Sequence, residues 1–195
     1  MESTKATVPI AAAGRVIERL DLFERNACRR INRFAHRPRV RALFAAVSRL
    51  GDGVFWYSLM LALPLGFGRQ GAAVSAQMVA AGVVALFTYK WLKSHLVRER
   101  PFASDQLIVC TTAPLDRYSF PSGHTLHAVL FTTLTLTAFP VLWPVLIPFA
   151  LLVALSRVVL GLHYPTDVLV GAAIGFALAR LAQITLPIIQ FAPAA

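Results

Sequence analysis

The chain has 195 residues, of which 57% are hydrophobic and only 14% are charged. A soluble globular protein carries about 25% charged residues. The composition therefore excludes an ordinary soluble domain, and the mean hydropathy of +0.64 indicates one domain whose solvent is a lipid bilayer. The net charge of +10 is concentrated ahead of the apolar part of the chain.

The segment 1–52 carries most of the basic residues, interleaved with apolar side chains, a pattern typical of amphipathic helices on anionic headgroups. We expect a basic amphipathic interfacial segment over 1–52, with two helices broken at Pro38, because so many arginines make a transmembrane span costly. Nucleic-acid binding and a merely solvated basic face are the alternatives. The apolar remainder favours membrane lipids, and no nucleic acid, as partners. The basic residues are Lys5, Arg15, Arg19, Arg25, Arg29, Arg30, Arg33, Arg37, Arg39, Arg41 and Arg49.

Five apolar stretches follow, and most approach the ~20 residues that a spanning helix needs. The first is short and fits a tilted or partly interfacial helix. All connections are short except a polar loop over about 98–120, which suits an antiparallel bundle. We therefore predict an all-α, polytopic membrane helix bundle of about five to six transmembrane helices, forming a domain over 53–195. The stretches cover about 54–67, 72–92, 122–139, 141–160 and 165–189.

Ionisable side chains stand at the ends of these apolar stretches, where they are costly and functional by default. Consecutive spans alternate in direction, so the end of the second stretch, the start of the third, the end of the fourth and the start of the fifth face the same side. The alternation gathers six residues at one membrane face: Lys93, Arg100, His124, Arg157, His163 and Asp167.

Three cations in this set, Lys93, Arg100 and Arg157, require an anion, and phosphate suits both the guanidinium fork and the ammonium charge. Lys93 and Arg100 are seven residues apart and share a helix face if the helix continues to Pro101. Taken singly, Lys93 or Arg98 could simply snorkel at a helix end.

A helix start directly after Pro121 adds a second phosphate-binding feature. Backbone N–H groups near Ser122 and Gly123 point at an anion there, and glycine permits a close approach.

Two histidines supply the chemistry. Asp167 lies one helical turn after His163, so its carboxylate can fix one imidazole nitrogen and aim the other at phosphorus. His124 can then protonate the leaving oxygen. Asp167 could instead be a charge that favours the helix start. His124 and His127 form an H-x-x-H pattern that could hold a metal, but the acids and thiols that complete such sites are missing nearby, so we expect no metal.

Three segments resemble the type 2 phosphatidic acid phosphatase family, which is related to the vanadium haloperoxidases. They are Lys93-x6-Arg100-Pro101, Pro121-Ser122-Gly123-His124 and Ser156-Arg157-x5-His163-x3-Asp167. The resemblance covers about 53–190, and the chain is shorter than the six-span members.

The resemblance implies a role for each of these residues. His163 forms a phosphohistidine, Asp167 orients it, and His124 protonates the leaving group and then activates water. Lys93, Arg100, Arg157 and the amides near Ser122 and Gly123 bind the phosphate oxygens.

We therefore expect an integral-membrane lipid phosphatase without metal or cofactor, in a bacterial inner membrane. Its substrate would be phosphatidate, phosphatidylglycerophosphate or a polyprenyl phosphate or diphosphate. With five spans, the basic segment and the site share a side, which favours a cytoplasmic site. A lipid phosphotransferase using the same residues is the alternative, and a membrane anion transporter is less favoured because no charge lies at mid-membrane.

Overall fold

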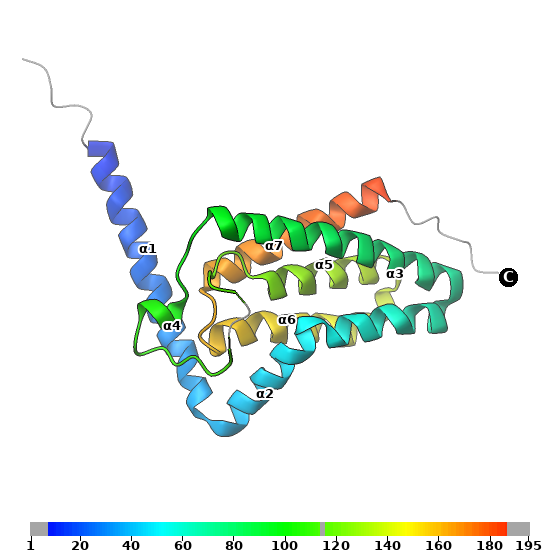
Figure 1. Ribbon diagram of the computed structural model, residues 1–195, viewed down its shortest axis with the longest axis horizontal. Helices are drawn as coiled ribbons and strands as arrows, with labels where there is room; N and C mark the ends of the chain where they lie inside the picture. Colours follow the sequence, from blue (N-terminus) through cyan, green and yellow to red (C-terminus); the bar gives the residue numbers. More distant parts are fainter. Residues whose placement is uncertain (1–7, 114–115, 187–195) are drawn as a thin grey trace, which may run out of the picture.

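The computed structural model describes residues 8–113 and 116–186. Within these ranges the chain consists of helices and their connections, without a β-strand, and the prediction of an all-α bundle is confirmed (Figure 1). The short helix α4 and the loops on either side of it lie at one end of the bundle, beside α1 (Figure 1).

The amino-terminal region forms two helices joined by a single 3-10 turn. Helix α1 (Val8–Asn32) is followed by η1 (Arg33–His36) and α2 (Pro38–Arg49). Pro38 occupies the first turn of α2, and Arg37 before it is extended, because a residue that precedes proline is disfavoured in the helical region. The predicted break at Pro38 is confirmed. In Figure 1, α1 projects from the bundle and α2 returns to it.

Helix α2 continues almost without interruption into the first apolar stretch. A π-helical turn, η2 (Leu50–Val54), joins it to α3 (Phe55–His95). Helix α3 folds back on itself at Gly68, whose φ of 56° and ψ of −134° suit glycine, so α3 consists of two arms. Figure 1 shows this reversal where the colour passes from cyan to green. The first two predicted stretches are these two arms.

The remaining helices complete the bundle around a central member. They are α4 (Pro101–Ser104), α5 (Gly123–Ala138), η3 (Pro140–Leu142), α6 (Trp143–Val159) and α7 (Pro165–Thr185). By length and composition, three helical stretches of the described chain could cross a membrane: Pro38–His95, Pro140–Val159 and Pro165–Thr185. Helix α5 has only 16 residues and is surrounded by α3, α6 and α7.

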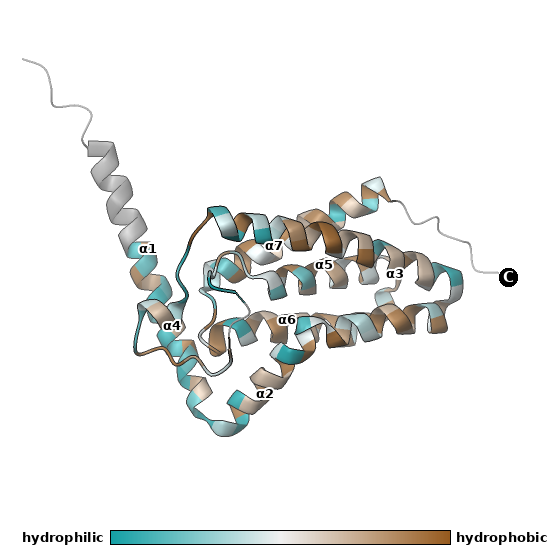
Figure 2. Ribbon diagram, in the orientation of Figure 1, coloured by the Kyte–Doolittle hydropathy of each residue, from teal (hydrophilic) through white to brown (hydrophobic). Residues whose placement is uncertain are grey.

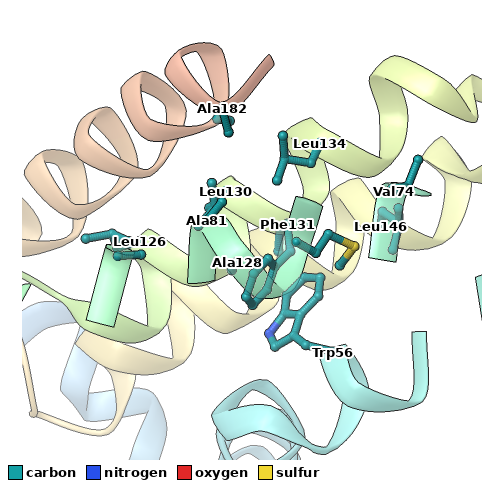
Figure 3. Close-up of a cluster of buried hydrophobic side chains, with 14 of the residues drawn as sticks. Trp56, Val74, Ala81, Leu126, Ala128, Leu130, Phe131, Leu134, Leu146 and Ala182 are labelled. Atoms are coloured by element: carbon teal, nitrogen blue, oxygen red, sulfur yellow. The ribbon is translucent and has the colours of Figure 1, made fainter. Parts of the chain in front are cut away.

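The core forms where α5 meets its neighbours. Leu126, Leu130 and Leu134 recur every four residues along α5 and are 0–1% exposed, and Trp56 from α3 packs in the same cluster (Figure 3). Between helices in a bilayer, such contacts stabilise the bundle through van der Waals packing and not through transfer from water. The four-residue spacing of these leucines thus determines which face of α5 packs against the neighbouring helices.

Helices α5 and α7 approach unusually closely because α7 carries Gly171 and Gly175 one turn apart. A Cβ atom at Gly171 would lie 2.6 Å from the Ser122 carbonyl oxygen, and one at Gly175 would lie 2.3 Å from that of Leu126. Small residues at this spacing let the backbones of membrane helices pack together. This contact sets the starts of α5 and α7 side by side.

Hydropathy divides the molecule along its length. In Figure 2, hydrophilic residues gather at the end of the bundle that holds α4, the described part of α1 and the start of α2, while apolar residues dominate the long helices. Large side chains such as Leu65 (88% exposed) and Ile184 (75% exposed) face outward. Outward-facing apolar side chains on long helices are what a lipid environment requires.

Candidate active site

A cavity of about 380 Å³ lies at the hydrophilic end of the bundle. Its lining includes apolar residues, among them Met60, Met78 and Phe131, as well as polar and charged ones. The titratable residues that line it are Asp52, Tyr57, Tyr89, Lys93, Arg100, Asp116, His124, His127, Arg157 and His163. The cavity thus joins charged groups from α3, α5, α6 and the connections between helices.

His163 lies in the connection between α6 and α7 and is 2% exposed. Its Nε2 atom lies 3.4 Å from Nη1 of Arg100, on the cavity side. Its Nδ1 atom lies 3.6 Å from Oδ2 of Asp167 and is buried without a hydrogen bond. The carboxylate therefore lies at the Nδ1 side of the ring, and Nε2 is the nitrogen on the side of Arg100 and the cavity.

Asp167 is fully buried and serves two purposes at the start of α7. Its Oδ2 accepts a hydrogen bond from the backbone N–H of Tyr164 at 2.9 Å, as part of a capping box. Its Oδ1 accepts one from Nη1 of Arg98 at 2.6 Å. Both interpretations of Asp167 from the sequence, helix-start charge and partner of His163, are therefore compatible with its position.

Arg98 holds this carboxylate from outside. Its guanidinium also pairs with Glu24 of α1 and stacks over the Tyr164 ring at 4.0 Å. Glu24, 6% exposed, accepts hydrogen bonds from the backbone N–H and hydroxyl of Thr166. Arg98 is thus part of a buried ionic network, contrary to the interpretation that it snorkels at a helix end.

Helix α1 supports the site through one face. Glu24, Cys28 and Asn32 recur every four residues and are 6%, 0% and 1% exposed. The Asn32 side chain donates to the carbonyl oxygens of Val109 and Val159 and accepts from the Val109 N–H. The inner face of α1 therefore fixes the polar loop and the end of α6.

The three predicted phosphate-binding cations converge, but through different elements than expected. Helix α3 ends at His95 and does not continue to Pro101, so Lys93 and Arg100 do not share a helix face. The chain instead runs extended through Arg100 (φ −77°, ψ 152°) and turns it back to the cavity. The expectation of one shared helix is wrong, although both side chains reach the same cavity.

Each cation has a protein partner in this structure. The Lys93 ammonium donates to Oδ2 of Asp116 at 2.7 Å. Arg100 donates to the carbonyl oxygens of Asp116 and Leu162, and Nη1 of Arg157 donates to the Ser48 hydroxyl. The Nε atom of Arg157 is buried without a hydrogen bond, which leaves one donor for a further acceptor.

The positive charges act directly on His163. Burial first, and then the charges of Arg157, Arg100 and Lys93, lower the pKa of His163 well below the usual value of histidine. The ring is therefore neutral near pH 7, which is the form in which a histidine can act as a nucleophile.

The second histidine, His124, lies in the first turn of α5 and lines the cavity. Its Nε2 atom lies 3.4 Å from Oδ1 of Asp52 in η2. His127 also lines the cavity, but its ring nitrogens face the carbonyl oxygens of Gly123 and Gly82, at 2.9 and 3.4 Å. In the described residues, no group of three His, Cys, Asp or Glu side chains could hold a metal ion.

The helix start at Ser122 differs in detail from the expectation. The Ser122 amide donates to the Asp167 carbonyl oxygen at 3.0 Å, and its hydroxyl lies 3.0 Å from that of Thr125. The residue is fully buried and does not line the cavity, whereas Gly123 does. An anion would therefore meet the amides from Gly123 onward, since the first amides of a helix have no partner within it.

Sequence reasoning did not assign Glu24, Ser48, Asp52 or Asp116 to the candidate site, and it interpreted Arg98 only as a cation that could snorkel at a helix end. One signal was available, because acids within a strongly basic segment, and Glu24, Cys28 and Asn32 at intervals of four, mark an inward face of α1.

Comparison with known proteins finds a matching family model and similar sequences. The family model described as PAP2 superfamily matches residues 74–188. The decaprenylphosphoryl-5-phosphoribose phosphatase of Mycolicibacterium smegmatis is 37% identical over 145 residues, which cover 70% of this chain and 74% of that protein. The undecaprenyl-diphosphatase of Sulfolobus acidocaldarius is 32% identical over 138 residues, which cover 70% of this chain and 66% of that one.

Two solved structures share the fold. The crystal structure of Aquifex aeolicus LpxE matches with a TM-score of 0.66 and 24% identity, covering 83% of this chain and 95% of that one. The first transmembrane PAP2 type phosphatidylglycerolphosphate phosphatase from Bacillus subtilis matches with a TM-score of 0.63 and 25% identity, covering 86% and 88%.

The fold and the composition define an integral membrane protein of helical architecture with a charged cavity at one end. The chain belongs to the PAP2 superfamily. The resemblance drawn from the three sequence motifs is thereby confirmed.

Proposed function

We propose that this protein is a lipid phosphate phosphatase that works through a phosphohistidine at His163. The observation that carries the proposal is a single cavity in which the Nε2 atom of His163 and the ring of His124 meet three cations. A nucleophile, a proton carrier and preorganised positive charge are the parts that phosphoryl transfer needs.

In the first half of the reaction, Nε2 of His163 attacks phosphorus and the ester or anhydride P–O bond breaks. His124 donates a proton to the departing oxygen, and Lys93, Arg100 and Arg157 bind the other phosphate oxygens as their charge grows. Asp167 stabilises the positive charge that develops on the His163 ring.

In the second half, water attacks the phosphohistidine while His124 takes a proton from it. The N–P bond breaks, phosphate leaves, and His163 returns to its neutral form. The same ring thus gives a proton in one step and recovers one in the next.

A polyprenyl phosphate or diphosphate is the proposed substrate class. The two relatives at 37% and 32% identity are named for a decaprenyl and an undecaprenyl substrate. The apolar residues that line the cavity, among them Trp56, Met60 and Met78, offer contacts for the first units of a hydrocarbon chain.

The test is phosphate release by the purified protein from a panel of polyprenyl and glycerolipid phosphates, with acid-quench trapping of labelled phosphoenzyme. His163→Asn should abolish both turnover and trapping, whereas His95→Asn, an exposed histidine outside the cavity, should change neither. A phosphohistidine that persists in His163→Asn and disappears in His124→Asn would exchange the two roles. Label that appears on another lipid would identify a phosphotransferase instead.

Metal independence is part of the proposal, since Lys93, Arg100 and Arg157 supply positive charge around the transferred group. Activity should survive EDTA, and vanadate should inhibit it. Loss of activity in EDTA, with recovery on addition of a divalent ion, would contradict this part.

We also propose that the site faces the cytoplasm of a bacterial inner membrane, on the basis of the arginine-rich segment at the same end of the molecule. Gln106, exposed in the polar loop, is the labelling position, because Ser104 is hydrogen-bonded to Tyr164. Modification of Gln106→Cys by an impermeant reagent in intact cells, with Cys28 and Cys110 replaced by alanine, would contradict the assignment.

A further inference from the structure

Asp52 is an acidic residue of the cavity that the mechanism above does not use. It lies in η2, the π-helical turn between α2 and α3. Such turns occur frequently at functional sites because the extra residue redirects a side chain. Its position therefore suggests a role in the site and not only in the turn.

The glycines on both sides of Asp52 are required by the turn. A Cβ atom at Gly51 would lie 2.7 Å from Cγ2 of Val153 in α6, so only glycine allows this close approach. Gly53 has a φ of 137°, which other residues rarely adopt. The indole N–H of Trp56 donates to the Gly51 carbonyl oxygen at 3.2 Å and fixes the turn. These features hold the Asp52 carboxylate at the cavity wall.

The partner of this carboxylate is His124. Oδ1 of Asp52 lies 3.4 Å from Nε2 of His124, although the two residues are 72 positions apart in the sequence. The neighbouring carboxylates have other partners, since Asp116 pairs with Lys93 and Asp167 with Arg98. Asp52 therefore faces His124 without a competing ion pair of its own, and its negative charge acts on Arg157 of the same cavity as well.

A carboxylate is needed at this point because a protonated His124 would otherwise stand among cations. The groups that line the same cavity include Lys93 and Tyr89 from α3, Arg157 from α6, His127 from α5, and Arg100, Asp116 and His163 from the connections. Most of the charged members are positive and oppose a further positive charge. An acidic group within 4–6 Å favours the protonated ring.

We propose that Asp52 is a positioning residue that favours the imidazolium form of His124, and so supports proton transfer in both halves of the reaction. The inference rests on the proposed function. The ion-pair separation of 3.4 Å is longer than a strong hydrogen bond, so Nε2 keeps the freedom to exchange its proton with substrate or water. The proton passes to the leaving oxygen as the P–O bond breaks and returns from the attacking water, while Asp52 remains ionised throughout.

The test compares Asp52→Asn with Asp21→Asn, which removes one exposed carboxylate from α1 without touching the cavity. With a polyprenyl phosphate, Asp52→Asn should lower kcat/KM about 10- to 100-fold near pH 7.5, which is less than the ~10²–10⁴-fold of a complete proton-transfer contribution because His124 itself is retained. The alkaline limb of the kcat/KM profile should move down by about one pH unit. Asp52→Glu should restore its position, and Asp21→Asn should leave it in place.

A substrate with a good leaving group separates the two half-reactions. With an aryl phosphate, Asp52→Asn should form the phosphohistidine at nearly the wild-type rate and then accumulate it, because only hydrolysis still needs His124. An alkaline limb that stays in place in Asp52→Asn would overturn the inference even if activity falls, since lost activity alone fits a structural role of the turn.

The outcome is separable from that of the proposed function. If the wild-type protein released no phosphate from any lipid phosphate and formed no phosphoenzyme, the proposed function would fail. The protonated fraction of the His124 ring, followed by NMR with inorganic phosphate present, would still decide the inference. It should be lower at neutral pH in Asp52→Asn than in wild type, and equal fractions would overturn the inference.

Discussion

Replacement of Gly175 by alanine tests whether the close contact between α5 and α7 sets the geometry of the active site. The added Cβ atom would lie 2.3 Å from the Leu126 carbonyl oxygen, a backbone atom that cannot rotate away. Since such contacts are essentially never shorter than 3.0 Å, the two helices must separate by about 0.7 Å. His124 lies two residues before Leu126, and Asp167 lies two turns before Gly175, so the shift should reach both.

The expected cost has two parts. Overpacking in a close-packed interior typically destabilises a protein by about 1–3 kcal/mol. Since a misplacement of 1 Å can cost about 100-fold in rate, a shift of this size should lower kcat/KM by about 10- to 100-fold. Activity should fall while the fold is retained, because a loss of this size is smaller than the ~5–15 kcal/mol by which a folded protein is typically stable.

The assay is kcat/KM for a polyprenyl phosphate together with the thermal unfolding midpoint in detergent. Gly66→Ala is the matched control, because a Cβ atom there meets nothing within 4 Å. It should leave activity unchanged and stability equal or slightly raised, as alanine is preferred to glycine within helices. If Gly175→Ala kept wild-type activity and stability, the contact would not control the site.

Three further predictions concern charges. Glu24→Gln should weaken the contact that holds Arg98 and lower the free energy of unfolding by about 1.5–3 kcal/mol. It should also reduce kcat more than it raises KM. Unchanged kinetics would refute a link from α1 through Arg98 to the Asp167 carboxylate. Asp116→Asn should free Lys93 for phosphate and lower the inhibition constant of inorganic phosphate about fivefold, if this partly buried ion pair contributes ~1 kcal/mol, the upper end for exposed pairs. Equal or weaker inhibition would show that the Asp116 carboxylate and phosphate do not compete for Lys93. The pKa of His163 is lower in the folded protein than in the unfolded chain, so below about pH 6.5 the unfolded chain binds more protons than the folded protein. The free energy of unfolding should therefore decrease as the pH is lowered, by up to about 1.4 kcal/mol per pH unit. In denaturation series from pH 7 to 5, His163→Asn should lose less stability than wild type, and parallel losses would contradict this origin.

The helix ends and their common face could be predicted from the sequence because they depend on local patterns. Apolar stretches of the length of a span, and their alternating direction, were sufficient to bring Lys93, His124 and His163 to one cavity. The break at Pro38 followed from the backbone of proline alone. These features can be predicted without knowing which side chains are in contact.

The rest of the site depends on contacts between distant segments. Glu24 meets Arg98 across 74 positions, and the separation of Ser48 from Arg157 is 109. No local sequence pattern in these segments indicates which distant residue each side chain contacts. The few acidic residues of 1–52 were also overlooked because the segment as a whole is strongly basic. The extended conformation of Arg100 was more accessible, because the residue before a proline is disfavoured in the helical region, and this alone excludes a helix that continues to Pro101.

The inner face of α1 has a consequence for how the superfamily diversifies. The matched family region starts at residue 74, yet Glu24, Ser48 and Asp52 reach the site from before it. Transplanting only the matched region onto another membrane anchor would carry His163 and the three cations together with Asp116 and Asp167. It would leave out Glu24, which pairs with Arg98, Ser48, which accepts a hydrogen bond from Arg157, and Asp52, which faces His124. Two members with identical motifs can therefore differ in rate and pH range through a segment that the motifs do not include.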